Sequence, residues 1–199
     1  MQIRTVAGPA EVVLDLPEQP RFLLLLTHGA GGGVDTKDLL AVRDTALALG
    51  GGVARVRQPY QVSGRRAPGA TGPQDAAWLD VVTALREQVG AVPLIQGGRS
   101  NGARVACRTA AAAQVAGVLA LSFPLHPPGK PERSRVDELR CALDHGEVVV
   151  INGERDPFGV PAPADATAVH VVRGQAHAFR RVDALPALVR PWLLRWSAT

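Results

Sequence analysis

Ser100 lies at the centre of a G-x-S-x-G pattern that begins at Gly98 and ends at Gly102. An apolar stretch precedes the pattern and a helix-forming stretch follows it, which is the context of a nucleophile on a sharp strand-to-helix turn. Glycine is needed two residues to either side because larger side chains would collide with the neighbouring strand or helix. The first N–H groups of the helix then lie beside the serine. The pattern predicts a catalytic serine; the alternative is a glycine-rich turn that only needs flexibility.

A serine hydroxyl is a weak nucleophile and needs a base, usually a histidine oriented by a carboxylate. Asp156 follows the predicted strand at residues 147–151. His177 follows the predicted strand at residues 168–172. Sites in parallel sheets form at the carboxyl ends of strands, so these side chains are expected to meet. Because the order Ser, Asp, His is that of α/β-hydrolases, we predict a catalytic triad of Ser100, Asp156 and His177.

Alternatives remain for the individual members of this group. Glu154 competes with Asp156 for the role of the carboxylate, and we prefer Asp156. Taken singly, Asp156 also fits a turn before Pro157, and His177 also fits a surface histidine. A non-catalytic explanation is plausible for each residue alone, but it is much less plausible for a serine, an aspartate and a histidine that follow three strands in this order.

A glycine-rich stretch that starts at His28 follows the most apolar predicted strand. It resembles the HGGG motif of lipases, which presents a backbone N–H to a developing oxyanion. We expect the N–H groups of Ala30 and Asn101 to form the oxyanion hole, with Gly29 or Gly31 as alternatives to Ala30. Gly29 and Gly31 are also expected to contact the substrate, and His28 is expected to be structural.

The same glycines do not fit a nucleotide site. A G-x-G-x-x-G template that starts at Gly29 places Val34 at its third glycine, and one that starts at Gly31 places Thr36 there. The chain also has no GxxxxGK[ST] sequence, which excludes a P-loop. We therefore expect no cofactor.

Metal and thiol chemistry are not indicated either. The five histidines include no i, i+4 pair, and the two cysteines, Cys107 and Cys141, form no CxxC motif. We expect no metal site and free thiols, with Cys107 in the core two helical turns after Ser100.

Apolar strands alternate with amphipathic helices through the chain, which predicts a mainly parallel, doubly wound α/β sheet with helices on both faces. We expect one domain over residues 1–199. The predicted strands are 12–16, 22–27, 53–56, 92–95, 115–121, 147–151 and 168–172. The predicted helices run from 35 or 36 to about 49, from 75 to about 89, from 103 to 113, over 136–143, and from 185 to about 196, with a kink or break at Pro191. Residues 58–73 are rich in glycine and proline and are expected to be a loop.

The net charge of +4 comes mainly from arginine, with 20 arginines and 2 lysines among the 22 basic residues. These arginines are scattered rather than gathered into a patch, so we expect no nucleic-acid partner. The longest clean apolar run, residues 22–26, is too short to span a bilayer, so we expect no membrane association. Residues 1–8 contain no apolar h-region, so we expect no signal peptide and a cytoplasmic location.

A proline-rich segment at 124–131 lies between the serine and the aspartate. It is either a rigid surface connector or an overhang that brings His126 and Lys130 to the mouth of the site. We include His126 among the expected substrate contacts. Arg65 and Arg66 are further cations to test near the site.

Taken together, these motifs resemble the α/β-hydrolase superfamily, in its small, cap-poor, dienelactone-hydrolase-like branch, and most closely the testis-expressed protein thirty type and its bacterial relatives. The resemblance is carried by the glycine-rich start, the serine pattern and three later segments: 123–132 (FPLHPPGKPE), 155–158 (RDPF) and the terminal His177. It implies the hydrolase fold and the Ser100, Asp156, His177 triad, but no substrate. Asn101 departs from related elbows, which often carry Met or His.

The sequence therefore predicts a serine hydrolase that cleaves a small-molecule ester or thioester. At 199 residues, the sheet and its helices leave no room for a large cap, so an open, shallow pocket is expected. The alternative is a hydrolase-fold module that only binds, with an inert triad.

Overall fold

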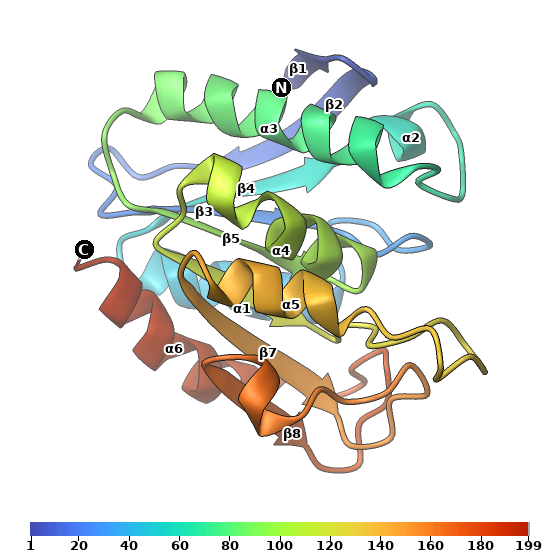
Figure 1. Ribbon diagram of the computed structural model, residues 1–199. Coiled ribbons are helices and arrows are strands. Elements are labelled where there is room, and N and C mark those ends of the chain that lie inside the picture. The colour runs from blue at the N-terminus through green and yellow to red at the C-terminus, as the bar shows by residue number, and fades with distance from the viewer. Residues whose placement is uncertain (199) are drawn as a thin grey trace.

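The computed structural model describes residues 1–198 and contains one eight-stranded mixed sheet (Figure 1). The strand order is β1-β2-β4-β3-β5-β6-β7-β8. The strands are β1 (Gln2–Thr5), β2 (Gly8–Asp15), β3 (Leu23–Thr27), β4 (Gly52–Arg57), β5 (Leu94–Arg99), β6 (Gly117–Leu121), β7 (Glu147–Gly153) and β8 (Ala168–Val172). The helices are α1 (Lys37–Ala48), α2 (Pro59–Val62), α3 (Thr71–Val89), α4 (Asn101–Ala113), α5 (Val136–Leu143) and α6 (Leu185–Trp196), with a 3-10 turn at Pro163–Asp165.

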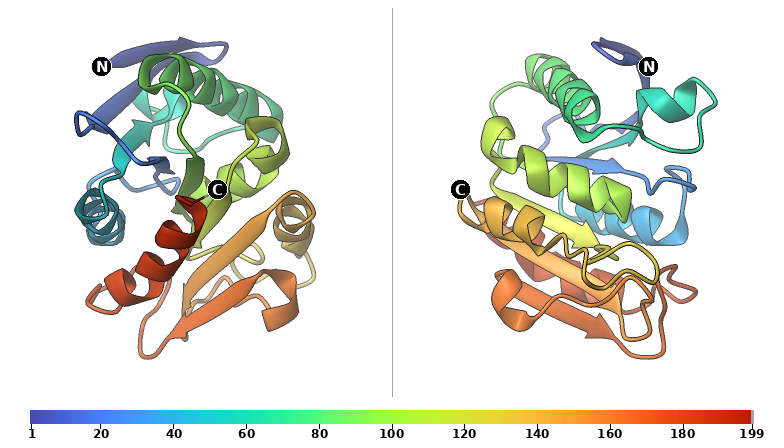
Figure 2. Two further views of the ribbon diagram at one scale, coloured as in Figure 1. Left: turned by 90° about the vertical axis from the view of Figure 1, so that its left-hand side faces the viewer. Right: turned by 45° about the vertical axis from the view of Figure 1, so that its right-hand side comes forward.

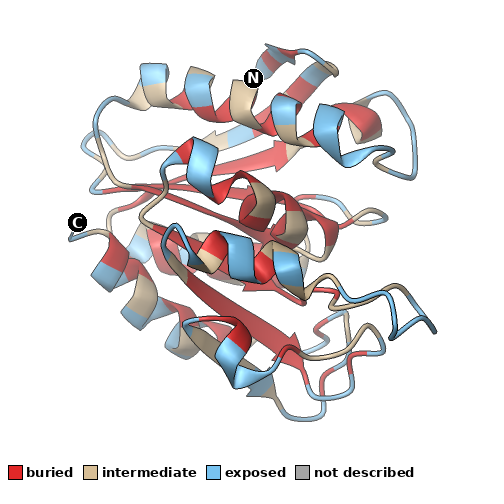
Figure 3. Ribbon diagram, in the orientation of Figure 1, coloured by how far each residue is buried: buried red, intermediate tan, exposed pale blue. Residues whose placement is uncertain are grey.

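Helices cover both faces of this sheet, as predicted. In the left view of Figure 2, α1 and α6 lie on one face, and α3, α4 and α5 lie on the other. Strand β3 shows why two layers are needed, because all five of its residues are buried. Leu24 and Leu26 join the core beneath α1 and α6, whereas Leu23 and Leu25 join the core beneath α3. The central strands are accordingly buried along most of their length, and exposed residues lie on the outer sides of the helices, in loops and on the edge strands β1, β2 and β8 (Figure 3).

The parallel part of the sheet fixes where the loops gather. Strands β4, β3, β5, β6, β7 and β8 are parallel, whereas β1 and β2 add an antiparallel edge. Thr27 at the end of β3 is in register with Gly98 near the end of β5. The segments that follow β3, β5, β7 and β8 therefore leave the same edge of the sheet, and they carry the predicted site residues.

The predicted loop at residues 58–73 is wrong in part. Pro59 begins the short helix α2, and α3 starts at Thr71, so that Pro73 lies in its first turn. Proline is tolerated in a first helical turn because its missing N–H would have no helical partner there. Proline in this segment therefore marks helix starts as well as a loop.

The break predicted at Pro191 is also wrong, because α6 runs through this residue without interruption. Val189, Leu193 and Trp196 of this helix are buried in the core beneath α1 and α6. Their burial offsets the one helical hydrogen bond that proline cannot donate. Strand β1 was not predicted from the sequence. It is a short edge strand in which only Ile3 and Thr5 are buried.

Candidate active site

Ser100 occupies a strained turn between β5 and α4, as the sequence pattern predicts. Its backbone has φ 55° and ψ −114°, a conformation that side-chain-bearing residues rarely adopt. A Cβ on Gly98 would lie 2.6 Å from the Thr27 carbonyl oxygen, and a Cβ on Gly102 would lie 2.5 Å from the same oxygen. Both glycines are therefore required by close packing against the end of β3, rather than by flexibility.

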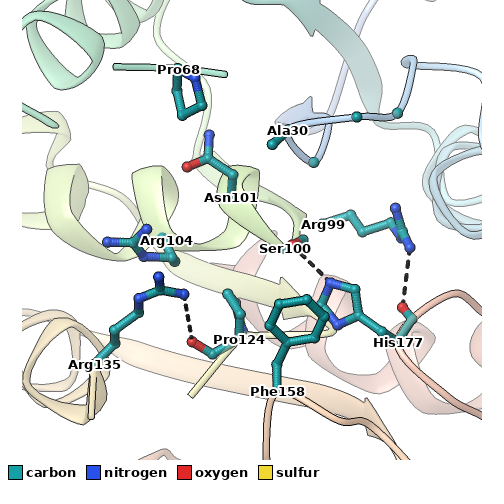
Figure 4. A pocket seen from close by; sticks show the side chains of 13 residues that line it. Ala30, Pro68, Arg99, Ser100, Asn101, Arg104, Pro124, Arg135, Phe158 and His177 are labelled. Atoms are coloured by element: carbon teal, nitrogen blue, oxygen red, sulfur yellow. Dashed lines mark hydrogen bonds between the residues drawn. The ribbon is translucent and has the colours of Figure 1, made fainter. Parts of the chain in front are cut away.

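The structure brings Ser100, His177 and Asp156 into one chain of hydrogen bonds. The His177 Nε2 lies 2.9 Å from the Ser100 Oγ (Figure 4). On the other side of the ring, Nδ1 lies 2.9 Å from the Asp156 Oδ2 and 3.1 Å from its Oδ1. A carboxylate accepts a proton donated by Nδ1, which leaves Nε2 free to accept the serine proton. This arrangement has the geometry of a nucleophile, a general base and an orienting carboxylate.

The carboxylate of Asp156 is held in place by contacts other than the one with His177. Its side chain is fully buried, and Oδ1 accepts a hydrogen bond of 2.9 Å from the Phe158 backbone N–H. The competing carboxylate, Glu154, instead accepts a hydrogen bond from the Gly174 N–H at an exposed position. Glu154 thus connects the loops that follow β7 and β8, and Asp156 is the acid that contacts His177.

Several side chains hold the loop that carries His177. The buried side chain of Gln175 accepts hydrogen bonds from the N–H groups of Arg180 and Arg181 through its Oε1. The Phe158 ring packs on the imidazole with ring centroids 4.2 Å apart. Phe158 belongs to the 155–158 segment noted in the sequence, but the sequence analysis gave no role to Phe158 or to Gln175, because their contacts with the histidine loop depend on how the loops after β7 and β8 pack together.

The glycine-rich stretch after β3 passes directly beside the serine. A Cβ on Gly29 would lie 3.2 Å from the Ser100 Cβ. Within residues 1–198, the backbone N–H groups of Ala30 and Asn101 have no hydrogen-bond acceptor, and both residues line the cavity at Ser100. These two donors are therefore available to a negative charge that develops at a substrate oxygen.

His28 orients the first of these donors. Its Nε2 accepts a hydrogen bond of 3.0 Å from the Gln58 N–H, so Nδ1 carries the proton and donates to the Gly29 carbonyl oxygen at 2.8 Å. The Gly29 carbonyl and the Ala30 N–H belong to one planar trans peptide and point in opposite directions. Holding the carbonyl therefore fixes the direction of the Ala30 N–H. Burial lowers the pKa of His28, which favours the neutral ring that this role requires.

A cavity of about 460 Å³ opens above Ser100. Its lining residues are Gly29, Ala30, Gly31, Gly32, Pro68, Arg99, Ser100, Asn101, Arg104, Pro124, Arg135, Phe158 and His177. The lining includes every predicted site residue except Asp156, which lies behind His177, and His126. The ring of His126 contacts the chain around Pro127 and Gly159.

Three arginines in this lining were missed by sequence reasoning. Arg99 is the variable residue before the serine, Arg104 lies one turn into α4, and Arg135 immediately precedes α5. The predicted cations Arg65, Arg66 and Lys130 are not in the lining. The spacing of Arg99 and Arg104 from Ser100 is visible in the sequence, but the approach of Arg135 depends on the path of the segment after β6.

Cys107 lies in the core, as the sequence predicts. Both cysteines are free; Cys107 is buried, which raises the pKa of its thiol, and Cys141 is exposed. None of the helices in residues 1–198 has both the length and the apolar character that a bilayer crossing requires.

Comparison with known proteins identifies the fold. The profile of a family described as "Alpha/beta hydrolase domain" matches residues 20–183. Among curated proteins, none matches the sequence. Est1E from Butyrivibrio proteoclasticus, solved with ferulic acid bound, has a TM-score of 0.79 and 18% identity over 100% of both chains.

Two further solved structures share this architecture. XC6422 from Xanthomonas campestris, described as a serine hydrolase without lid, has a TM-score of 0.76 and 20% identity over 98% of this chain and 93% of that chain. An alpha-beta serine hydrolase homologue from Coxiella burnetii has a TM-score of 0.73 and 15% identity over 98% and 95%. The fold predicted from the sequence, with little or no cap, is confirmed.

Proposed function

The chain belongs to the alpha/beta hydrolase domain family, and from this premise we propose that it is a serine hydrolase that cleaves a small ester or thioester. The observation that carries the proposal is the continuous hydrogen-bonded chain from the Ser100 Oγ through His177 to Asp156, with both outer contacts at 2.9 Å. A hydroxyl whose proton is already shared with an oriented imidazole is prepared for nucleophilic attack.

The first half of the reaction forms an acyl-enzyme. The Ser100 Oγ bonds to the carbonyl carbon while its proton passes to the His177 Nε2, and Asp156 stabilises the resulting imidazolium. The N–H groups of Ala30 and Asn101 hold the oxyanion of the tetrahedral intermediate. When this intermediate collapses, the bond from carbon to the leaving oxygen or sulfur breaks. The proton on Nε2 moves to the leaving group, which departs as an alcohol or thiol.

The second half of the reaction restores the enzyme. A water molecule attacks the acyl carbon and gives one proton to the His177 Nε2, and the same two N–H groups hold the second oxyanion. The Ser100 Oγ then leaves with the proton from Nε2, and the acid product is released. The cavity above Ser100, at about 460 Å³, suits a small substrate.

The competing hypothesis is a binding module with an inert triad. That hypothesis expects His177 to lie out of hydrogen-bond reach of Ser100 or Asp156, because a scaffold has no need of such contacts. The distances above argue for the enzyme instead.

Labelling and turnover test the proposal. We expect a fluorophosphonate probe to phosphonylate the Ser100 Oγ with loss of fluoride, and we expect hydrolysis of short p-nitrophenyl esters. Both should fall by about 10³-fold or more in Ser100→Ala.

Ser122→Ala is the matched control. Like Ser100, Ser122 directly follows a strand and has positive φ. It is buried, and its Oγ has no hydrogen-bond partner among the described residues. This variant should keep labelling and turnover. Absence of both in the wild-type protein, or persistence of both in Ser100→Ala, would show that the proposal is wrong.

A further inference from the structure

The polar side chains around the cavity at Ser100 are unusually rich in positive charge. Three arginines, Arg99, Arg104 and Arg135, belong to the lining, and no aspartate or glutamate does. In Figure 4, Arg104 and Arg135 lie next to each other on the side of the cavity formed by Pro124. The wall of the site thus offers many hydrogen-bond donors and a positive field.

The positive charges of two of these arginines are neutralised by carboxylates outside the cavity lining. The Nε of Arg99 lies 3.0 Å from the Asp38 Oδ2. Arg104 makes a two-pronged contact with Glu138, at 2.9 and 2.6 Å. These pairs hold the two guanidinium groups in place but leave little free charge.

Arg135 differs because it has no carboxylate partner. Within residues 1–198, no acidic oxygen lies within 4.0 Å of its guanidinium, and its only side-chain hydrogen bond is a long one of 3.4 Å to the Pro124 carbonyl oxygen. Glu138, the acid whose charge acts on Arg135, is already shared between Arg104 and Arg108.

The surroundings of Arg135 oppose its charge. Burial, and then the nearby charge of Arg104, lower the pKa of the Arg135 guanidinium, and the negative charge of Glu138 offsets this only in part. Arginine nevertheless stays protonated in proteins near neutral pH. The cavity therefore holds a partly desolvated cation whose partner is not supplied by the described chain.

We propose that the substrate ester carries a carboxylate, that Arg135 binds this carboxylate, with Arg104 beside it, and that the ester carbonyl lies at Ser100. The inference rests on the proposed hydrolase function and names the substrate class for the same site. Arg104 lies four residues after Ser100, a rise of about 6 Å along α4. The distance between ester and carboxylate is therefore that of a short spacer, as in a half-ester of a small dicarboxylic acid.

An alternative is that Arg135 has only a structural role, in which its hydrogen bond to the Pro124 carbonyl oxygen holds the segment after β6 in place. If the role is only structural, substitution of Arg135 should lower kcat/KM for charged and uncharged esters equally. Loss of an anion-binding group lowers turnover of the charged ester in particular, and its effect fades as salt is added. The ratio of two kcat/KM values separates the two readings.

The experiment compares charged esters with uncharged amides of the same shape. One pair is methyl hydrogen glutarate and methyl glutaramate, in which the acyl half carries the charge. The other pair is 3-(4-acetoxyphenyl)propanoate and its amide, in which the leaving half carries it. We expect kcat/KM to favour the carboxylate about tenfold or more in at least one pair at low salt. The pair that responds shows which half of the substrate lies at Arg135.

The variants are Arg135→Gln and the matched control Arg133→Gln. Arg133 is exposed, lies two residues away and is not in the cavity lining, and its substitution changes the net charge equally. Arg135→Gln should lower the preference for the carboxylate about tenfold, and added salt should lower it in the wild type. Arg133→Gln should leave the preference unchanged within about twofold. Circular dichroism and fluorophosphonate labelling check that Arg135→Gln is folded.

A binding measurement distinguishes failure of this inference from failure of the hydrolase proposal. In at least one of the two pairs, the carboxylate should bind the Ser100→Ala variant more tightly than its amide, by calorimetry, whether or not turnover occurs. Equal kcat/KM values and equal binding within both pairs would overturn the inference and leave the hydrolase proposal intact. An unchanged preference in Arg135→Gln would also overturn it. Absence of labelling and of all ester turnover, together with tighter binding of the carboxylate, would overturn only the hydrolase proposal.

Discussion

Arg99 and His177 are joined by a hydrogen bond of 3.2 Å, which the Arg99 Nη2 donates to the backbone carbonyl oxygen of His177. The same guanidinium lies 3.0 Å from the Asp38 carboxylate at the start of α1. Arg99 therefore ties the loop of the histidine to the turn of the serine and to a helix on the other side of the glycine-rich stretch. It acts as a positioning residue through His177.

Replacement of Arg99 should weaken catalysis more than substrate binding. Arg99→Lys keeps the charge, but an ammonium group cannot span both contacts as the guanidinium does. We expect kcat to fall about tenfold, with a smaller change in KM, and fluorophosphonate labelling to slow in parallel. Steady-state kinetics and the labelling rate measure the effect. Equal kcat in wild type and Arg99→Lys would exclude this role.

Arg99→Met should also destabilise the protein, because it leaves the buried Asp38 carboxylate without its cationic partner and, among the described residues, with only the Leu39 backbone N–H as a donor. The side chain of Asp38 is only 4% exposed, so the expected loss of unfolding free energy is about 3 kcal/mol. The exposed pair of Arg43 and Asp44 is the control. Arg43→Met should cost no more than about 1 kcal/mol in urea unfolding. Similar losses in both variants would contradict the importance of burial.

The choice of Asp156 over Glu154 can be tested directly. Asp156→Asn keeps the size of the side chain but can no longer stabilise the imidazolium or favour the required tautomer, so kcat should fall about 10³-fold or more. Glu154→Gln should change kcat by less than about threefold, because Glu154 contacts Gly174 rather than His177. A large loss in Glu154→Gln with little loss in Asp156→Asn would reverse the assignment.

The two glycines of the serine turn should not tolerate a methyl group. In Gly98→Ala the new Cβ would meet the Thr27 carbonyl oxygen at 2.6 Å, and backbone atoms cannot move aside cheaply. We expect a loss of about 2 to 3 kcal/mol in unfolding free energy, together with loss of labelling at Ser100. Gly72→Ala is the control, since a Cβ there meets nothing within 4 Å. That variant should be neutral or slightly stabilised, and equal effects of the two substitutions would count against the steric argument.

His28 should make stability depend on pH. Its pKa in the folded protein lies below the ordinary value of 6.5 because the ring is buried. Above about pH 6.5 both states hold the ring neutral; as the pH falls below 6.5, only the unfolded state takes up the proton. The unfolding free energy should therefore fall with pH, by at most about 1.4 kcal/mol per pH unit from this residue.

Urea unfolding of wild type and His28→Gln at pH 7.5 and pH 5.5 measures this contribution. The variant should be less stable at pH 7.5 but should lose less stability on acidification, since the other four histidines are common to both proteins. Parallel losses in the two proteins would show that His28 is not the group responsible.

Much of the fold and the core of the candidate site could be predicted from local patterns. Apolar runs such as Leu23–Thr27 mark strands that are buried on both faces, and the edge of a parallel sheet determines where their loops meet. For this reason Ser100, Asp156 and His177 could be named together. Residues 58–73 were read incorrectly because proline is compatible with both a loop and a first helical turn.

The sequence by itself determined which residues we propose for the chemistry, because a nucleophile, a base and a carboxylate each need a particular side chain after a particular strand. Only the tertiary structure decided what surrounds them. The approach of Arg135 to the cavity and the bond from Arg99 to His177 join residues far apart in the chain. The pairing of Arg104 with Glu138 depends in the same way on how α4 packs against α5. Such contacts follow from the packing of whole elements, which no local spacing encodes.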